Sequence, residues 1–198
     1  ILLPILCVQD MISIYSYRKS FHLRNLIILL PAATVGIVFG YLWFSLLSED
    51  NIRIFLGLLA ITFSLNYFFF SKDSKLADVS VTKGSFWGTI SGFTSFGIHA
   101  GGLPFNIYML PQKLDHRVYV GTAAIFFGIV NLIKLYPYYL LDQLRIENIT
   151  TALFLFHFAP IGFYIGFKLT HKLDGDRFYG ITYFCLLIIG LKLLSDGI

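Results

Sequence analysis

The residues best suited to chemistry lie in an apolar span that glycines, a histidine and a proline interrupt. The span is Gly84–Leu110, with the sequence GSFWGTISGFTSFGIHAGGLPFNIYML. Each interior Gly costs a helix about 1 kcal/mol and each Pro about 3 kcal/mol. At membrane depth every freed backbone group must also find a partner, and such breaks persist where they line a cavity. We therefore expect this broken or re-entrant Gly-rich segment to form the centre of a transport pathway.

Several residues at this break could bind a solute. Where a helix restarts after a break, its backbone N–H groups and positive dipole end attract an anion. His99 could donate to substrate, relay protons near its ordinary titration range of about pH 6.5, or be a hydrogen-bonded core histidine. A structural kink satisfied by neighbouring helices is the alternative for the whole break. The substrate-binding candidates here are Thr94, Ser95, Gly97, His99, Gly101, Gly102 and Asn106.

Two charged residues fall within or near apolar segments, where charges are functional candidates. Asp10 follows Gln9 in the first segment, and Lys134 follows Asn131 by three residues, hence on the same helix face. Together with His99, they are our candidates for coupling protons or balancing charge. Lys134 could instead snorkel to the membrane interface. The face of Asn131 and Lys134 continues through Gly121, Ala124 and Gly128.

The bulk composition indicates an all-α polytopic membrane protein. The 198-residue chain is 57% hydrophobic and 13% charged, with a mean hydropathy of +0.75, whereas soluble domains carry about 25% charged residues. Several apolar segments reach the roughly 18 residues that a spanning helix needs. We expect a multi-pass protein of a cell membrane, either a plasma membrane or a bacterial inner membrane. The apolar segments are residues 1–14, 26–47, 52–70, 84–110, 118–141, 149–169 and 178–194.

The basic residues lie in the loops between these segments, which argues against nucleic-acid binding and for a topology signal. If residues 84–110 cross the membrane once, the basic residues divide 7 against 6 between its two sides. If the segment enters and returns on one side, they divide 11 against 2. As one helix it would also measure about 40 Å, against a hydrocarbon core of about 30 Å. Both observations favour the returning path, with the basic side cytoplasmic.

A faint internal repeat predicts two helical repeats of inverted orientation, as in many secondary transporters. We expect residues 1–75 to be a truncated first transmembrane repeat and residues 84–198 to be the second. The first lacks a counterpart of the Gly-rich segment and the chain begins with Ile1, so we expect its natural beginning to be missing. The matching glycines are Gly36, Gly40 and Gly57 in the first repeat and Gly162, Gly166 and Gly180 in the second.

No pattern in the chain indicates an enzyme. It contains no HExxH, GxSxG or Walker sequence, and its two cysteines lack metal spacing. Gly84, Gly88 and Gly92 recur at every fourth residue, which indicates the close approach of another helix. We therefore expect no catalytic residue, no metal site and no cofactor.

The broken segment and the residues that follow it resemble the second half of the sulfite exporter TauE/SafE family of membrane transporters. The similar stretches are Gly92–Ser95, His99–Pro104, Tyr119–Thr122 and Asn131–Lys134. The later part of the family's first half is similar to Leu3–Asp10, Tyr17–Lys19 and Leu30–Gly40. The resemblance implies a two-repeat permease for sulfur oxyanions such as sulfite, sulfonates or sulfoacetate. It also adds Thr122 and Asn131 to the substrate-binding candidates.

This chain departs from the family pattern at the break. Phe96 stands where many members have another Gly, and His99 where many have a small residue. The family's first Gly-rich element is absent. These differences concern the residues that would contact the substrate, so they bear on which anion is carried.

We therefore expect a membrane permease that moves a small anion, a sulfur oxyanion such as sulfite or an organosulfonate, through a site at the repeat interface. A secondary carrier of a cation or neutral solute is one alternative, favoured if Asp10 faces the break. A non-transporting membrane scaffold is the other, and it predicts a dry, packed break. The expected partners are the small anion and the lipid bilayer, without nucleic acid, and a homodimer is one option for the assembly.

Overall fold

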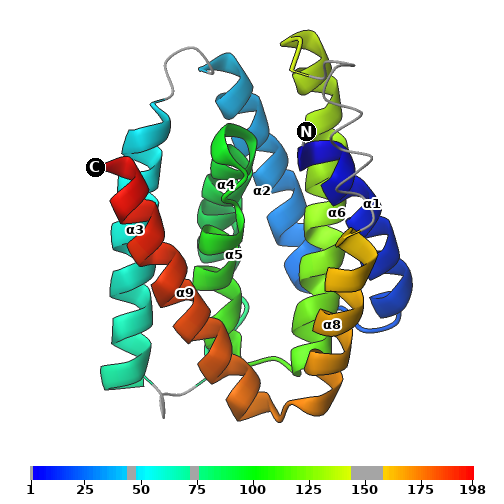
Figure 1. Ribbon diagram of the computed structural model, residues 1–198, viewed down its shortest axis with the longest axis vertical. Helices are drawn as coiled ribbons and strands as arrows, with labels where there is room; N and C mark the ends of the chain where they lie inside the picture. Colours follow the sequence, from blue (N-terminus) through cyan, green and yellow to red (C-terminus); the bar gives the residue numbers. More distant parts are fainter. Residues whose placement is uncertain (1, 44–47, 72–75, 144–157) are drawn as a thin grey trace. The chain divides into compact units, whose positions relative to one another are not determined.

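All regular secondary structure in residues 2–43, 48–71, 76–143 and 158–198, which this computed structural model describes, is helical (Figure 1). A π-helical turn, Tyr67–Ser71, continues α3, and a 3-10 turn, Leu110–Gln112, continues α5. The prediction of an all-α fold is confirmed. The α-helices are α1 (Leu2–Tyr17), α2 (Leu23–Leu42), α3 (Glu49–Asn66), α4 (Val81–Ile98), α5 (Gly102–Met109), α6 (His116–Leu140), α8 (Phe158–Lys172) and α9 (Gly175–Gly197).

Four described helices are long and apolar enough to cross a membrane: α2, α3 with its π-helical turn as far as Phe69, α6 and α9. Their outer faces carry large apolar side chains, such as Phe184 and Ile188 on α9, which are about half exposed. Such faces suit contact with lipid tails. The predicted multi-pass membrane protein is confirmed. Residues 149–157 of the predicted apolar segment 149–169 lie outside the described part of the chain. Three of the basic residues that were counted on the two sides of the membrane also lie outside it, namely Lys72, Lys75 and Arg145.

Polar side chains before the helices fix where they begin. The Ser48 hydroxyl accepts from the Asn51 amide before α3, and the Ser80 hydroxyl accepts from the Lys83 amide before α4. The Asp115 carboxylate accepts from the amides of Arg117 and Val118 at the start of α6. Such caps satisfy amides that the first helical turn leaves without an intrahelical partner.

The chain forms two compact units. Unit 1 comprises Ile1–Leu30 and Asp115–Leu173, and unit 2 comprises Pro31–Leu114 and Asp174–Ile198. The boundary within α2 falls at Pro31. Each unit combines pieces of both predicted repeats, so the units and the repeats divide the chain differently. The two-repeat organisation stays a prediction.

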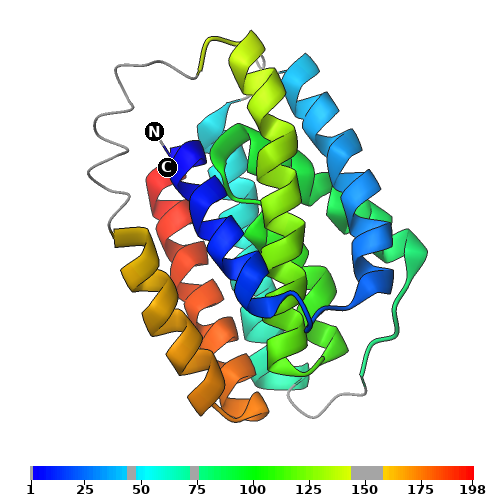
Figure 2. The same ribbon diagram turned by 90° about the vertical axis from the view of Figure 1, so that its right-hand side faces the viewer.

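In unit 1, α1 lies along α6, and α8 contacts both helices (Figure 2). Glycines on α6 allow the close approach of α1. A Cβ atom on Gly128 would lie 2.6 Å from Cδ1 of Ile14, and one on Gly121 would overlap the carbonyl oxygen of Ser20. The predicted small and polar stripe of α6 therefore faces α1.

In unit 2, α3 and α9 run side by side (Figure 1). Gly57 and Gly190 lie at their contact, where a Cβ atom on Gly57 would come within 2.9 Å of the Gly190 carbonyl oxygen. Further along, the rings of Tyr67 and Tyr183 stack at 3.6 Å between centroids, with 3° between their planes. Small residues at one level and stacked rings at another thus hold this pair together.

Unit 2 also contains a close approach between α2 and α4. A Cβ atom on Gly36 would overlap the carbonyl oxygen of Thr89, and one on Gly92 would overlap that of Ala33. These are backbone atoms, which cannot move aside as a flexible side chain can. The two helices therefore pack backbone to backbone at this level.

The glycines of the predicted repeat serve different packing roles. Cβ atoms added to Gly36, Gly40 and Gly57 would each come within 3 Å of another atom. Cβ atoms on Gly162, Gly166 and Gly180 would meet nothing within 4 Å. The first set permits helix contact, whereas the second set borders open space.

We predict that Gly92→Ala destabilises the protein by about 1–3 kcal/mol, because the added methyl group must displace the backbone of α2. Gly180→Ala is the matched control, and it should stabilise the protein by up to about 1 kcal/mol, because its Cβ atom meets open space and alanine favours a helix over glycine. Unfolding in detergent micelles measures both. Equal stability of the two variants would contradict the α2–α4 packing described here.

Candidate functional site

The predicted break is a helical hairpin. Helix α4 ends at Ile98, His99 takes a left-handed conformation with φ 55° and ψ 24°, and α5 begins at Gly102. The chain then runs back along α4, since the Tyr108 hydroxyl donates to the Ser80 carbonyl oxygen at 3.3 Å. At the open end, the Ala77 amide donates to the Pro111 carbonyl oxygen at 3.0 Å. Both ends of the hairpin thus lie together, and its re-entrant path through a bilayer stays a prediction.

Hydrogen bonds within the hairpin satisfy the backbone at its tip. The Ser91 hydroxyl donates to the Gly101 carbonyl oxygen at 2.7 Å, and the Ala100 amide donates to the Thr94 carbonyl oxygen at 3.2 Å. A Cβ atom on Gly101 would lie 2.6 Å from both the Ser91 carbonyl oxygen and Cβ of Ser95. Only glycine fits there. Ser91, which sequence reasoning did not select, thus fastens the tip to α4.

The structure places the predicted binding residues of the break at different depths. Thr94 and Ser95 are buried in α4, and the Thr94 hydroxyl donates to the Ile90 carbonyl oxygen at 2.8 Å. That bond engages its proton, so Thr94 is a weaker anion donor than expected. Nearer the tip, Gly97, His99, Gly102 and Asn106 are partly exposed. Their roles in binding stay predictions.

The predicted polar residues of unit 1 come together between α1 and α6. The Asn131 side-chain amide donates to Oδ2 of Asp10 at 2.7 Å. The Lys134 side chain is 1% exposed, which places it inside the protein, and its charge attracts that of Asp10. A carboxylate, an amide and an ammonium group that acts electrostatically on the carboxylate thus lie in segments flanked by apolar residues.

The fourth predicted residue of unit 1, Thr122, joins a loop to α6. Its hydroxyl donates to the Val118 carbonyl oxygen at 2.6 Å and accepts from the His22 amide at 2.8 Å. The side chain is fully buried. In this structure Thr122 positions the turn between α1 and α2, and its binding role stays a prediction.

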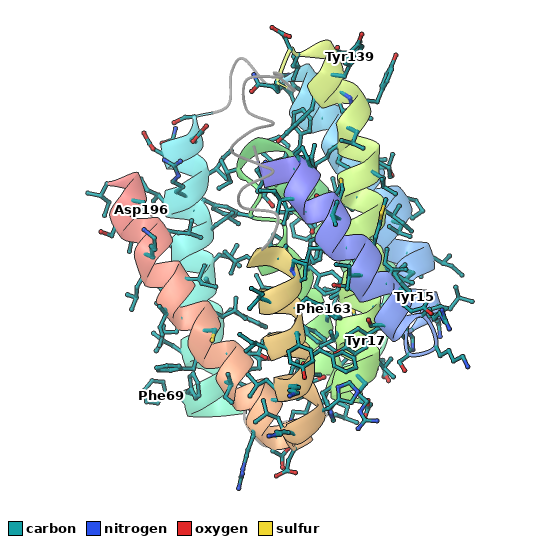
Figure 3. All side chains as sticks on the ribbon, turned by 45° about the vertical axis from the view of Figure 1, so that its right-hand side comes forward. Tyr15, Tyr17, Phe69, Tyr139, Phe163 and Asp196 are labelled. Carbon is teal, nitrogen blue, oxygen red and sulfur yellow. The ribbon has the colours of Figure 1, made fainter. Side chains whose placement is uncertain are left out.

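Unit 1 also contains an open cavity of about 290 Å³ between α1, α6 and α8. Figure 3 labels Tyr17 and Phe163, two of the side chains that line it. Sequence reasoning found Asp10 but missed four polar lining residues: Gln9, Ser13, Tyr17 and Thr170. The spacing of Gly162, Gly166 and Thr170 at every fourth residue was a usable signal, because it creates a strip of small residues along one face of α8.

The chain is similar to one family of known proteins. The family model for Sulfite exporter TauE/SafE matches residues 1–193. The chain belongs to the TauE/SafE family. The resemblance inferred from the sequence is confirmed, and the protein is accordingly a membrane transporter rather than a member of an enzyme family. No curated protein and no solved structure matches the chain.

We predict that Lys134→Met destabilises this TauE/SafE protein by about 1–3 kcal/mol, because it removes the counter-charge of the half-buried Asp10 carboxylate. Combining it with Asp10→Asn should restore most of that loss, since the double variant holds no uncompensated charge. A double-mutant cycle of unfolding free energies in detergent measures the coupling. Additive effects of the two substitutions would contradict an electrostatic interaction between Asp10 and Lys134.

Proposed function

We propose that this TauE/SafE transporter moves a small sulfur oxyanion, such as sulfite or an organosulfonate, and binds it at the tip of the α4–α5 hairpin. Family membership supports the class of substrate. The hairpin supports the place, because residues 84–112 contain no Asp, Glu, Lys or Arg. The tip therefore offers hydrogen-bond donors without a carboxylate that would repel an anion.

Several hydrogen-bond donors belong to the residues of this tip. The first turn of α5 presents the amides of Gly102 and Leu103, and the preceding Gly101 has no side chain to cap them. Backbone amides at a helix start, together with the helix dipole, favour a negative charge. The side chains of His99 and Asn106 are partly exposed close by in the sequence. An oxyanion accepts hydrogen bonds from such amide and imidazole groups.

A cation carrier is the alternative that one observation favours, namely the carboxylate of Asp10 in the unit 1 cavity. Lys134 beside it weakens that case, because the ammonium group offsets the carboxylate charge. Transport of a sulfur oxyanion therefore remains the function that the chemistry supports best.

We predict that His99→Gly weakens saturable sulfite transport by about 10- to 100-fold in apparent affinity, since a hydrogen bond to a charged group contributes about 1.5–3 kcal/mol. Glycine is the chosen replacement because His99 has φ 55°, a conformation that glycine adopts without strain. The measurement is radiolabelled sulfite flux into proteoliposomes that contain the full-length protein.

Lys113→Gly is the matched control. Lys113 also has a positive φ, 43°, but it follows the 3-10 turn, far in sequence from the hairpin tip. The sulfite flux of the Lys113→Gly variant should equal that of the wild type. Equal flux in both variants would exclude His99 from the site. If the wild type transports neither sulfite nor any tested sulfonate, sulfur oxyanions are excluded as substrates. A cation carrier and a non-transporting scaffold are then the remaining candidate functions.

A further inference from the structure

The unit 1 cavity carries a row of polar side chains that the proposed anion site does not use. Asp10, Ser13 and Tyr17 line it from α1, at spacings of three and four residues that place them on one helix face. Thr170 of α8 lines it near Tyr17. From Asp10 to Tyr17 the row extends about 10 Å along α1, at about 1.5 Å per residue.

The cavity is large enough to hold water, and polar side chains line part of its mostly apolar wall. Its volume of about 290 Å³ compares with roughly 30 Å³ for one water molecule in the liquid. Tyr17 is 4% exposed, and its hydroxyl lies by Thr170 but makes no hydrogen bond of good geometry within the described residues. A buried hydroxyl left in this way costs about 1–3 kcal/mol. Water in the cavity would satisfy it.

One end of this polar row lies where unit 1 carries its basic residues. Tyr17 ends α1 immediately before Arg18 and Lys19, and Arg117 interacts with Tyr17 from the first turn of α6. The ring of His171 on α8 lies 6.2 Å from that of Tyr17. Basic residues mark the cytoplasmic side by the positive-inside rule. The row therefore connects Asp10 with the side predicted to be cytoplasmic.

The groups around Asp10 define what it could bind. Among the described residues, Lys134 of α6 and Cys7 of α1 are the titratable groups that interact with Asp10, and the Asn131 side-chain amide donates to its Oδ2 atom. Helix α8 contributes no titratable side chain to the cavity lining. The carboxylate repels anions, and the Lys134 ammonium group disfavours a metal cation. A proton is the cation that binds to one carboxylate oxygen without needing further ligands.

We propose that Asp10 is a proton-binding group of this transporter and that the unit 1 cavity is the water-filled path by which protons reach it. Binding converts the carboxylate and one proton into a carboxylic acid. The Asp10–Lys134 pair then changes from no net charge to one positive charge. This added charge favours the uptake of an anion, and in that respect the proposal rests on the proposed function.

The first test is chemical labelling of the wild-type, full-length protein in proteoliposomes. A water-soluble carbodiimide with glycine ethyl ester converts an accessible protonated carboxyl group into an amide, which peptide mass spectrometry locates. We expect labelling of Asp10 that decreases as the pH rises. Asp174, whose side chain is 78% exposed, is the internal control, because its labelling shows how a carboxyl group in open solvent reacts at each pH. Failure of Asp10 to react, or reaction only with lipid-soluble dicyclohexylcarbodiimide, would overturn the water-filled path.

A matched pair of variants tests whether the cavity is the route. Gly166→Leu should place a side chain in the cavity without a backbone clash, because a Cβ atom there meets nothing within 4 Å. Gly180→Leu makes the same change on α9, outside the cavity and also in open space. We expect Gly166→Leu to abolish Asp10 labelling and Gly180→Leu to preserve it. Equal labelling in both would overturn the route.

The second test separates proton coupling from anion movement. In proteoliposomes, the Asp10→Asn/Lys134→Met double variant, which holds no uncompensated charge, should retain sulfite exchange at equal pH on both sides but lose uptake driven by a pH gradient. Wild-type gradient-driven uptake in the variant would overturn the proposal. So would loss of both activities in the folded variant, because the Asp10–Lys134 pair would then act in anion movement itself. A wild type that transports no sulfite would refute the proposed function. The labelling of Asp10 would still test whether water in the unit 1 cavity reaches this carboxyl group.

Discussion

The need to satisfy backbone hydrogen-bonding groups without water governs the architecture of the α4–α5 hairpin. Helix α4 stops at Ile98, so the groups of the next residues need other partners. The Ser91 hydroxyl and the Thr94 carbonyl oxygen supply two of them, bonding Gly101 and Ala100. Because these bonds fold the tip onto α4, the amides that start α5 occupy a fixed place. An anion site at this tip would be preorganised by the same bonds.

The two compact units place opposite chemistries in separate parts of the chain. The hairpin of unit 2 gathers amide and imidazole groups with no charged side chain in residues 84–112. Unit 1 holds a carboxylate and an ammonium group, and the carboxylate lines an open cavity with several polar side chains. A transporter that moves an anion together with a proton needs both chemistries. In the proposals above, the hairpin residues would bind the anion and Asp10 would bind the proton.

Glycine spacing alone did not distinguish packing from open space. Gly92, in the ridge that recurs at every fourth residue, packs against the backbone of α2 as that spacing predicts. Gly162 and Gly166 have the same spacing on α8, yet a Cβ atom at either position would meet nothing within 4 Å. Both patterns create a smooth strip of small residues. Whether a neighbouring helix or a cavity covers that strip depends on elements far away in the sequence.

The sequence by itself determined the membrane class, the helical content, the family and the position of the break. These follow from local properties: hydropathy, periodicity, and the cost of Gly and Pro in a helix. The shared helix face of Asn131 and Lys134 was likewise predictable from their three-residue spacing. Only the tertiary structure decided that Asp10 lies against this face, 121 residues away in sequence, and that Tyr17 and Thr170 share a cavity. Contacts between distant helices depend on how whole surfaces pack, and no local pattern encodes which faces meet.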